Sequence, residues 1–210
     1  MALSFSTAAM EHLAASDPVM GSIVKAHGAL DLEQRTRGRP GEAYGALVRS
    51  IAGQQLSVKA AHTIYLRVCD LFGGRTPTPR ELIDTDPELL RAAGLSYSKA
   101  AYLADLAHRV ESDELAVDRF SELDDREVSE QLVQVKGIGQ WTADVFMMFH
   151  LGRPDVLPVG DLGIRKAAEI NYGLRKLPSP DRLRRVARPW RPYRTLACVY
   201  LWESLGNAPD

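Results

Sequence analysis

The chain has 210 residues, of which 45% are hydrophobic and 25% are charged, and its formal net charge is −1 at pH 7. This composition is ordinary for a soluble protein that forms one domain or two small lobes with a buried core. The sequence contains no run of about 18 apolar residues, so a membrane-spanning helix is not expected. The first 20 residues lack a basic segment, and Glu11 and His12 interrupt their apolar pattern, which favours a cytoplasmic protein without a secretory signal.

Cysteine and histidine usage argues against disulfides and metal sites. Cys69 and Cys198 both fall in apolar helical patterns, where buried thiols are the expected state in a reducing compartment. The five histidines show no metal-ligand spacing. We therefore expect no metal and no cofactor.

Charge is distributed unevenly along the chain. Residues 161–210 hold ten Lys/Arg and five Asp/Glu, whereas residues 111–130 hold nine carboxylates and two arginines. A protein that approaches a phosphate backbone benefits from concentrating positive charge on one side. A solvated basic helix face over residues 182–194 explains the same composition, so charge alone leaves both interpretations open.

The predicted elements are all helical. Asp17 and Ser57 are expected N-caps, Gly73 ends a helix, and residues 75–85 (RTPTPRELIDT) are predicted to be a proline-rich connection. No segment alternates with a period of two, so we predict the all-α class with about ten helices. The clearest predicted helices cover residues 4–15, 17–28, 42–72 with a break near Gly53, 86–94, 96–110 and 124–135.

The most informative stretch covers residues 132–166. One helical pattern ends there, the chain turns at KGIG (136–139), and a second helix with an apolar face begins. We expect φ > 0 at both Gly137 and Gly139, with the backbone uncovered by side chains. The N–H groups of residues 139–141 would then form a helix N-terminus that binds phosphate, because unpaired donors and the helix dipole both favour an anion.

This stretch resembles the helix–hairpin–helix of the HhH-GPD DNA glycosylases, through the pattern V-x-G-I-G-x-W-T-A-D at residues 135–144. The sequence LPVGD at 157–161 is similar to that superfamily's Gly/Pro-rich loop ending in an essential aspartate, 22 residues after Gly139. Further similar segments lie at 50–57 and 190–194. Within the superfamily, the motifs are most similar to those of the enzymes that remove alkylated bases.

The resemblance implies an all-α, two-lobed helix–hairpin–helix DNA glycosylase fold with the active-site cleft between the lobes. One lobe is expected over 43–153, a helical barrel containing the hairpin, and the other over 1–42 plus 154–210. The implied activity is that of a monomeric, monofunctional DNA glycosylase acting on double-stranded DNA. It would flip out an alkylated purine (3-methyladenine, 7-methylguanine or a larger adduct) and leave an abasic site in base excision repair. Relatives also hold a monovalent cation at the hairpin backbone, which makes residues 135–140 a candidate site.

Asp161 is the predicted catalytic residue. Breaking an N-glycosidic bond leaves positive charge on the deoxyribose. A fixed carboxylate stabilises that charge and can orient or deprotonate water. The alternative is that Asp161 only caps the helix that follows it.

Aromatic and small side chains define the predicted base pocket. In relatives that also cut the strand, a lysine nucleophile occupies the position of Trp141, so we predict base removal by water here. Trp141, Trp190 and Tyr193 are candidates for stacking on a cationic alkylpurine, with core packing as the alternative for all three. Val145 and Gly163 are smaller than the residues common in relatives and are predicted to widen the pocket. Trp202, by contrast, is predicted to be a core residue.

The predicted DNA contacts include a segment that, in relatives, lies between two helices and pushes a side chain into the DNA. Such a wedge partly fills the hole left by the flipped base. Either Gln55 or Leu56 can be the wedge, and helix packing is the alternative for Leu56. The predicted contacts are Gln54, Gln55 and Leu56 in this segment, Lys136, Gly137, Ile138, Gly139, Gln140 and Thr142 at the hairpin, and Arg194.

Two other functions compete with this prediction. A non-catalytic helix–hairpin–helix module would bind DNA shape through backbone amides alone, but it would not need the carboxylate of Asp161 facing a polyanion. A bifunctional glycosylase/lyase for another damaged base would need a lysine where Trp141 stands.

Overall fold

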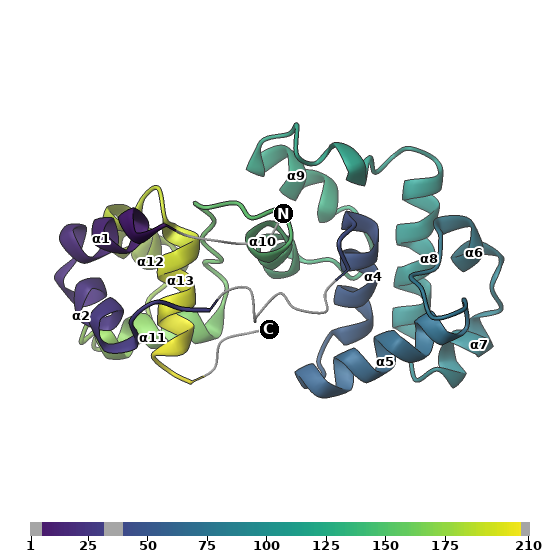
Figure 1. Cartoon of the computed structure of the whole chain (residues 1–210), viewed down its shortest axis with the longest axis horizontal. Helices are drawn as coiled ribbons and strands as arrows, with labels where there is room; N and C mark the ends of the chain where they lie inside the picture. The colour runs from purple at the N-terminus through teal and green to yellow at the C-terminus, as the bar shows by residue number, and fades with distance from the viewer. Residues whose placement is uncertain (1–5, 32–39, 207–210) are drawn as a thin grey trace. The chain divides into compact units, whose positions relative to one another are not determined.

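The computed structural model describes residues 6–31 and 40–206, and in these ranges the regular elements are all helices. The predicted all-α class is confirmed for this part of the chain. None of its helices is both long and apolar enough to cross a membrane. The chain divides into two compact units, drawn in Figure 1: unit 1 contains residues 6–31 and 147–206, and unit 2 contains residues 40–146. The predicted lobes, with their boundary at 153/154, stay a prediction.

Unit 1 is organised around its last helix, α13 (Arg194–Glu203), in which residues 195–202 are all buried. A helix that is buried all round belongs in a core, and α13 packs against α2 and α11. The remaining elements of this unit are α1 (Thr7–Ser16), α2 (Pro18–His27), α11 (Leu162–Asn171), α12 (Pro180–Val186) and the 3₁₀ turn η2 (Arg188–Trp190).

A buried carboxylate joins three parts of unit 1. Asp17 caps α2, as predicted, because its Oδ1 accepts hydrogen bonds from the N–H groups of Val19 and Met20 at 2.9 and 3.2 Å. Its Oδ2 accepts from the Tyr172 hydroxyl at 2.6 Å and from Trp190 Nε1 at 2.9 Å. Four donors offset the cost of burying the charge. The network therefore fixes Trp190 in the interior.

Unit 2 is organised around the 15-residue helix α8 (Tyr97–Glu111), which packs against α4, α6 and α7 (Figure 1). Its buried face consists of Ala100, Leu103, Leu106 and Ala107, which confirms the predicted apolar face. The other elements are α4 (Ala43–Gly53), α5 (Val58–Asp70), α6 (Pro79–Asp84), α7 (Pro87–Ala92), η1 (Val117–Arg119), α9 (Asp125–Leu132) and the first part of α10 (Gln140–Phe149).

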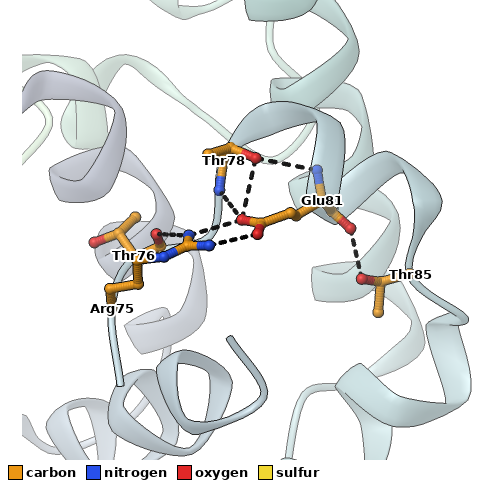
Figure 2. A network of polar contacts seen from close by, with 5 residues as sticks. All are labelled: Arg75, Thr76, Thr78, Glu81 and Thr85. Atoms are coloured by element: carbon orange, nitrogen blue, oxygen red, sulfur yellow. Dashed lines mark hydrogen bonds and ion pairs between the residues drawn. The ribbon is translucent and has the colours of Figure 1, made fainter. Parts of the chain in front are cut away.

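The segment predicted to be a proline-rich connection contains the short helix α6, so that prediction was wrong. Thr78 and Glu81 form a capping box, in which the Thr78 hydroxyl accepts from the Glu81 N–H at 3.3 Å and the Glu81 carboxylate accepts from the Thr78 N–H at 2.8 Å. Arg75 donates to the same carboxylate through both terminal guanidinium nitrogens (Figure 2). This contact lowers the pKa of Glu81 to about 2. Pro79 fits the first turn because its fixed φ suits a helix start.

The two cysteines lie in different units, Cys69 in α5 and Cys198 in α13. Both are buried and neither forms a disulfide. The predicted state of buried thiols is confirmed.

Candidate functional site

The hairpin between α9 and α10 depends on two glycines for different reasons. Gly137 has φ +82°, as predicted, and a Cβ there would lie 2.1 Å from Cδ2 of Tyr102, so no larger residue fits. Gly139 contradicts the prediction, because its φ is outside the left-handed region. A Cβ on Gly139 would meet nothing within 4 Å. Its exposed backbone therefore leaves open space beside the first turn of α10, where a phosphate would approach a helix N-terminus.

The start of the hairpin is held by Asp105 of α8. One carboxylate oxygen of Asp105 accepts from the Lys136 N–H at 2.9 Å and from Arg109 Nε at 3.1 Å. The other lies 3.4 Å from Lys136 Nζ. Burial opposes ionisation of Asp105, but the hydrogen bonds from Lys136 and Arg109 together outweigh it and lower its pKa. The Lys136 side chain is still largely exposed, so its contact with phosphate stays a prediction.

Several predicted DNA contacts of the hairpin have inward-facing side chains. Ile138 and Thr142 are buried, so a surface contact through their side chains is ruled out, and only contacts through their backbone stay predicted. The Gln140 side chain serves the fold, because its Nε2 donates to Ser129 Oγ and to Asp144 Oδ1, both at 2.8 Å. Burial raises the pKa of Asp144 to about 6.

Trp141 and Val145 occupy neighbouring positions on α10, one turn apart on the same face. Trp141 is 45% exposed, which is unusual for a tryptophan side chain, since tryptophan is highly buried on average. Val145 is partly exposed. Their assignment to the base pocket stays a prediction.

Asp161 is the N-cap of α11, and its carboxylate has a second donor. Oδ1 accepts from the Ile164 N–H at 2.7 Å and from Trp202 Nε1 at 3.0 Å, and the residue is only 8% exposed. The hydrogen bond expected if Asp161 serves only as the N-cap of α11 is therefore present. The same two bonds fix the plane of the carboxylate, which a catalytic role also requires.

Trp202 is a core residue, as predicted, but its contact with Asp161 was missed by the sequence analysis. The indole is buried and stacks on Phe149, with ring centroids 6.1 Å apart. Its N–H reaches a residue that lies 41 positions earlier in the chain. No local pattern in the sequence reveals such a pairing.

Gly163 lies directly beside Asp161 and Trp202. A Cβ on Gly163 would lie 3.2 Å from Asp161 Oδ1 and 3.2 Å from Trp202 Cδ1. The missing side chain therefore leaves room for the Asp161–Trp202 hydrogen bond, and its effect on the width of a base pocket stays a prediction.

Three further residues of unit 1 were predicted to contact the base or the DNA, and the prediction for Trp190 was wrong. Trp190 is 0% exposed and donates its N–H to Asp17, so it does not offer a face for stacking on a base. Arg194 is paired with Asp155, through Nε to Oδ1 at 2.6 Å and Nη2 to Oδ2 at 2.9 Å, and its side chain is 19% exposed. This ion pair fixes the guanidinium within the protein, and its contact with a phosphate stays a prediction. Tyr193 is half-buried with its ring edge-on to His12, and its pocket role stays a prediction.

The segment predicted to insert into DNA is the loop between α4 and α5, residues 54–57, which we call the insertion loop. Gln54 points its side chain to the hairpin, with Nε2 2.7 Å from the Gly137 carbonyl oxygen. Gln55 is exposed and has φ +60°. Leu56 is 42% exposed, so the alternative that it packs between helices is wrong. Either Gln55 or Leu56 can therefore serve as the predicted wedge.

The backbone carbonyl oxygens of the hairpin are the candidate ligands of the cation predicted at residues 135–140. The carbonyls of Val135, Gly137 and Gly139 accept hydrogen bonds from Ile138 N, Gln54 Nε2 and Ala143 N respectively. A carbonyl oxygen has a second lone pair that can still bind an ion, and the cation site stays a prediction.

A helical fold with a glycine hairpin at one helix N-terminus and a buried aspartate at another has the features expected of a helix–hairpin–helix DNA glycosylase. The family model described as "HhH-GPD superfamily base excision DNA repair protein" matches residues 48–192. The chain therefore belongs to the HhH-GPD superfamily, which confirms the resemblance seen in the sequence.

Individual relatives agree with this assignment. The chain is 37% identical over 165 residues to DNA-3-methyladenine glycosylase 1 of Schizosaccharomyces pombe, covering 78% of this chain and 72% of that protein. A solved structure of S. pombe 3-methyladenine DNA glycosylase in complex with abasic DNA has a TM-score of 0.81 at 33% identity, over 96% of this chain and 98% of the other. A crystal structure of DNA-3-methyladenine glycosidase from Bacillus halodurans has a TM-score of 0.83 at 36% identity, over 98% and 92%.

Proposed function

We propose that the protein is a monofunctional DNA glycosylase that removes alkylated purines, among them 3-methyladenine and 7-methylguanine, from double-stranded DNA. It would leave an abasic site and so begin base excision repair. The proposal depends above all on the carboxylate of Asp161, which Ile164 and Trp202 hold in one orientation. Relatives named for 3-methyladenine support the substrate class.

Asp161 would act on the sugar. As the N-glycosidic bond breaks, positive charge develops on the deoxyribose, and a carboxylate that is already oriented stabilises it without reorganisation. The same carboxylate can orient or deprotonate the attacking water. Because both donors bind Oδ1, they restrict rotation of the carboxylate about its Cβ–Cγ bond.

The exposed ring of Trp141 supports hydrolysis and a cationic substrate. An indole cannot form a Schiff base with the abasic sugar, so the strand is left uncut. Alkylation at a ring nitrogen makes a purine cationic, and an indole face attracts a cation with about 1–2 kcal/mol when water is excluded. These two properties would make Trp141 a pocket residue and not a nucleophile.

The test is release of free bases from randomly methylated duplex DNA, identified by mass spectrometry, by the wild type and by Asp161→Asn. Asparagine is a good N-cap and keeps an oxygen for Ile164 and Trp202, so the fold should survive while the charge is lost. We expect Asp161→Asn to lose excision by several orders of magnitude while its affinity for abasic-site DNA is kept, because the charge acts on the transition state. Turnover near that of the wild type in Asp161→Asn would contradict the assignment.

The capping bond of Asp161 also fits a second function, a non-catalytic DNA-binding module. In that case the wild type would bind duplex DNA yet release no base, since the carboxylate would serve only α11. The same assay therefore separates the two functions. The monomeric state and cytoplasmic location expected from the sequence stay predictions, which light scattering and cell fractionation can test.

A further inference from the structure

The insertion loop (residues 54–57) is anchored to distant parts of the chain through Gln54. The backbone carbonyl of Gln54 accepts a hydrogen bond from Lys99 Nζ at 2.6 Å. Its side-chain amide donates to the Gly137 carbonyl at 2.7 Å. The next residue, Gln55, is exposed and has φ +60°, a conformation that residues other than glycine adopt only when their surroundings hold them there. The exposed tip of the loop, Gln55 and Leu56, therefore directly follows Gln54, which is held by both Lys99 and Gly137.

Lys99 provides the first of these two attachments from a distant part of the chain. It lies in α8, 45 residues after Gln54, and its Nζ also donates to the Ala52 carbonyl at 2.9 Å. Both carbonyls are at the C-terminal end of α4, where carbonyls lack partners within the helix and the dipole is negative. One ammonium group therefore satisfies two acceptors and matches the local field.

The same helix also holds the hairpin. Asp105 accepts from the Lys136 N–H at the start of the hairpin, and the Tyr102 ring packs against Gly137 so closely that no Cβ would fit there. Lys99, Tyr102 and Asp105 are three residues apart in turn, so they lie along one side of α8. The insertion loop and the hairpin are thus both attached to one rigid helix, and Gln54 joins them directly.

We propose that Lys99 is a positioning residue for base extrusion, which holds the insertion loop at a set distance from the phosphate-binding hairpin. This inference rests on the proposed glycosylase function. A wedge stabilises an extruded base only if the returning base does not displace the inserted side chain. A loop that is already ordered also loses less conformational entropy when it inserts into the DNA. Lys99 itself need not touch the DNA.

The experiment compares single-turnover excision of 7-methylguanine from two duplexes, one with cytosine opposite the lesion and one with an abasic-site analogue opposite it. In the second duplex no base pair has to be broken. Lys99→Met keeps the length of the side chain and removes the ammonium group, and Lys59→Met removes a charge from an exposed lysine just beyond the loop. We expect Lys99→Met to be slower by roughly tenfold on the paired lesion and within about twofold of the wild type on the unpaired one. Lys59→Met should match the wild type on both.

Equal losses on the two duplexes, or a fall in melting temperature that explains the loss, would overturn the positioning role. A double-mutant cycle gives a second readout, with Gln55→Ala/Leu56→Ala removing the tip of the loop. If Lys99 acts through the tip, adding Lys99→Met to that variant should cost nothing more on the paired lesion, whereas multiplicative losses would overturn the inference. If the wild type excised the base from neither duplex, the proposed function itself would fail.

Discussion

A methyl group at residue 163 is expected to disturb Asp161 directly. The Cβ of Gly163→Ala would lie 3.2 Å from Asp161 Oδ1, 3.2 Å from Trp202 Cδ1 and 3.3 Å from Trp202 Nε1. These distances are tighter than ordinary Cβ contacts, so one neighbour must move. Trp202 is buried and stacked on Phe149, and so we expect the carboxylate to rotate and the Trp202–Asp161 hydrogen bond to lengthen.

The size of the effect follows from that hydrogen bond. A hydrogen bond to a charged acceptor contributes about 1.5–3 kcal/mol, and each 1.36 kcal/mol of lost transition-state stabilisation is about tenfold in rate. If the orientation of Asp161 depends on this bond, Gly163→Ala should slow excision by roughly ten- to a hundredfold. The same hydrogen bond also stabilises the folded protein, so the melting temperature should fall together with the activity. The rates are therefore compared at a temperature well below the melting temperature of the variant.

The assay is single-turnover excision from two duplexes, one containing 7-methylguanine and one containing ethenoadenine. Because the change acts on Asp161, both rates should fall by the same factor. Gly41→Ala is the control, since a Cβ there meets nothing within 4 Å and its φ is outside the left-handed region. A loss confined to ethenoadenine would refute the reasoning and show that Gly163 lines the pocket. Unchanged rates on both bases would show that the Trp202 contact does not orient the carboxylate.

Three further predictions concern unit 2. The pKa of Asp144 is raised from 3.8 to about 6 by burial. Its folded carboxyl therefore keeps a proton that the unfolded chain releases, and stability should fall as pH rises from about 4 to about 6. In Asp144→Asn, urea unfolding between pH 4 and 8 should lack that fall, gaining at most about 3 kcal/mol at pH 7. Gly137→Ala should lower the melting temperature, whereas Gly139→Ala should melt like the wild type but bind abasic-site DNA more weakly. Unchanged DNA binding in Gly139→Ala would exclude the hairpin as the phosphate anchor. Borohydride should trap no covalent adduct with abasic DNA, because Trp141 stands where relatives that cut the strand have a lysine, and efficient trapping would contradict the hydrolytic mechanism.

The amino-acid sequence by itself determined the features that depend on neighbouring residues. Helix periodicity predicted the all-α class, and short side-chain patterns predicted the caps at Asp17 and Ser57. The KGIG turn and the position of Asp161 after LPVG predicted the family. These features involve residues within a few positions of one another, and so their physics is visible in the linear chain. The prolines of residues 75–85 favour a connection and so conceal the helix α6, although Thr78 and Glu81 carry the capping pattern.

Only the tertiary structure decided which side chains face a site and which face the core. Trp190 and Arg194 looked available in the sequence, but their partners, Asp17 and Asp155, lie 173 and 39 residues away. Lys99, 45 residues from the loop it binds, gave no local pattern at all. A polar or aromatic side chain is equally suited to a ligand and to a distant partner within the protein. Which of the two it meets is set by how the helices pack, and a linear pattern does not contain that information.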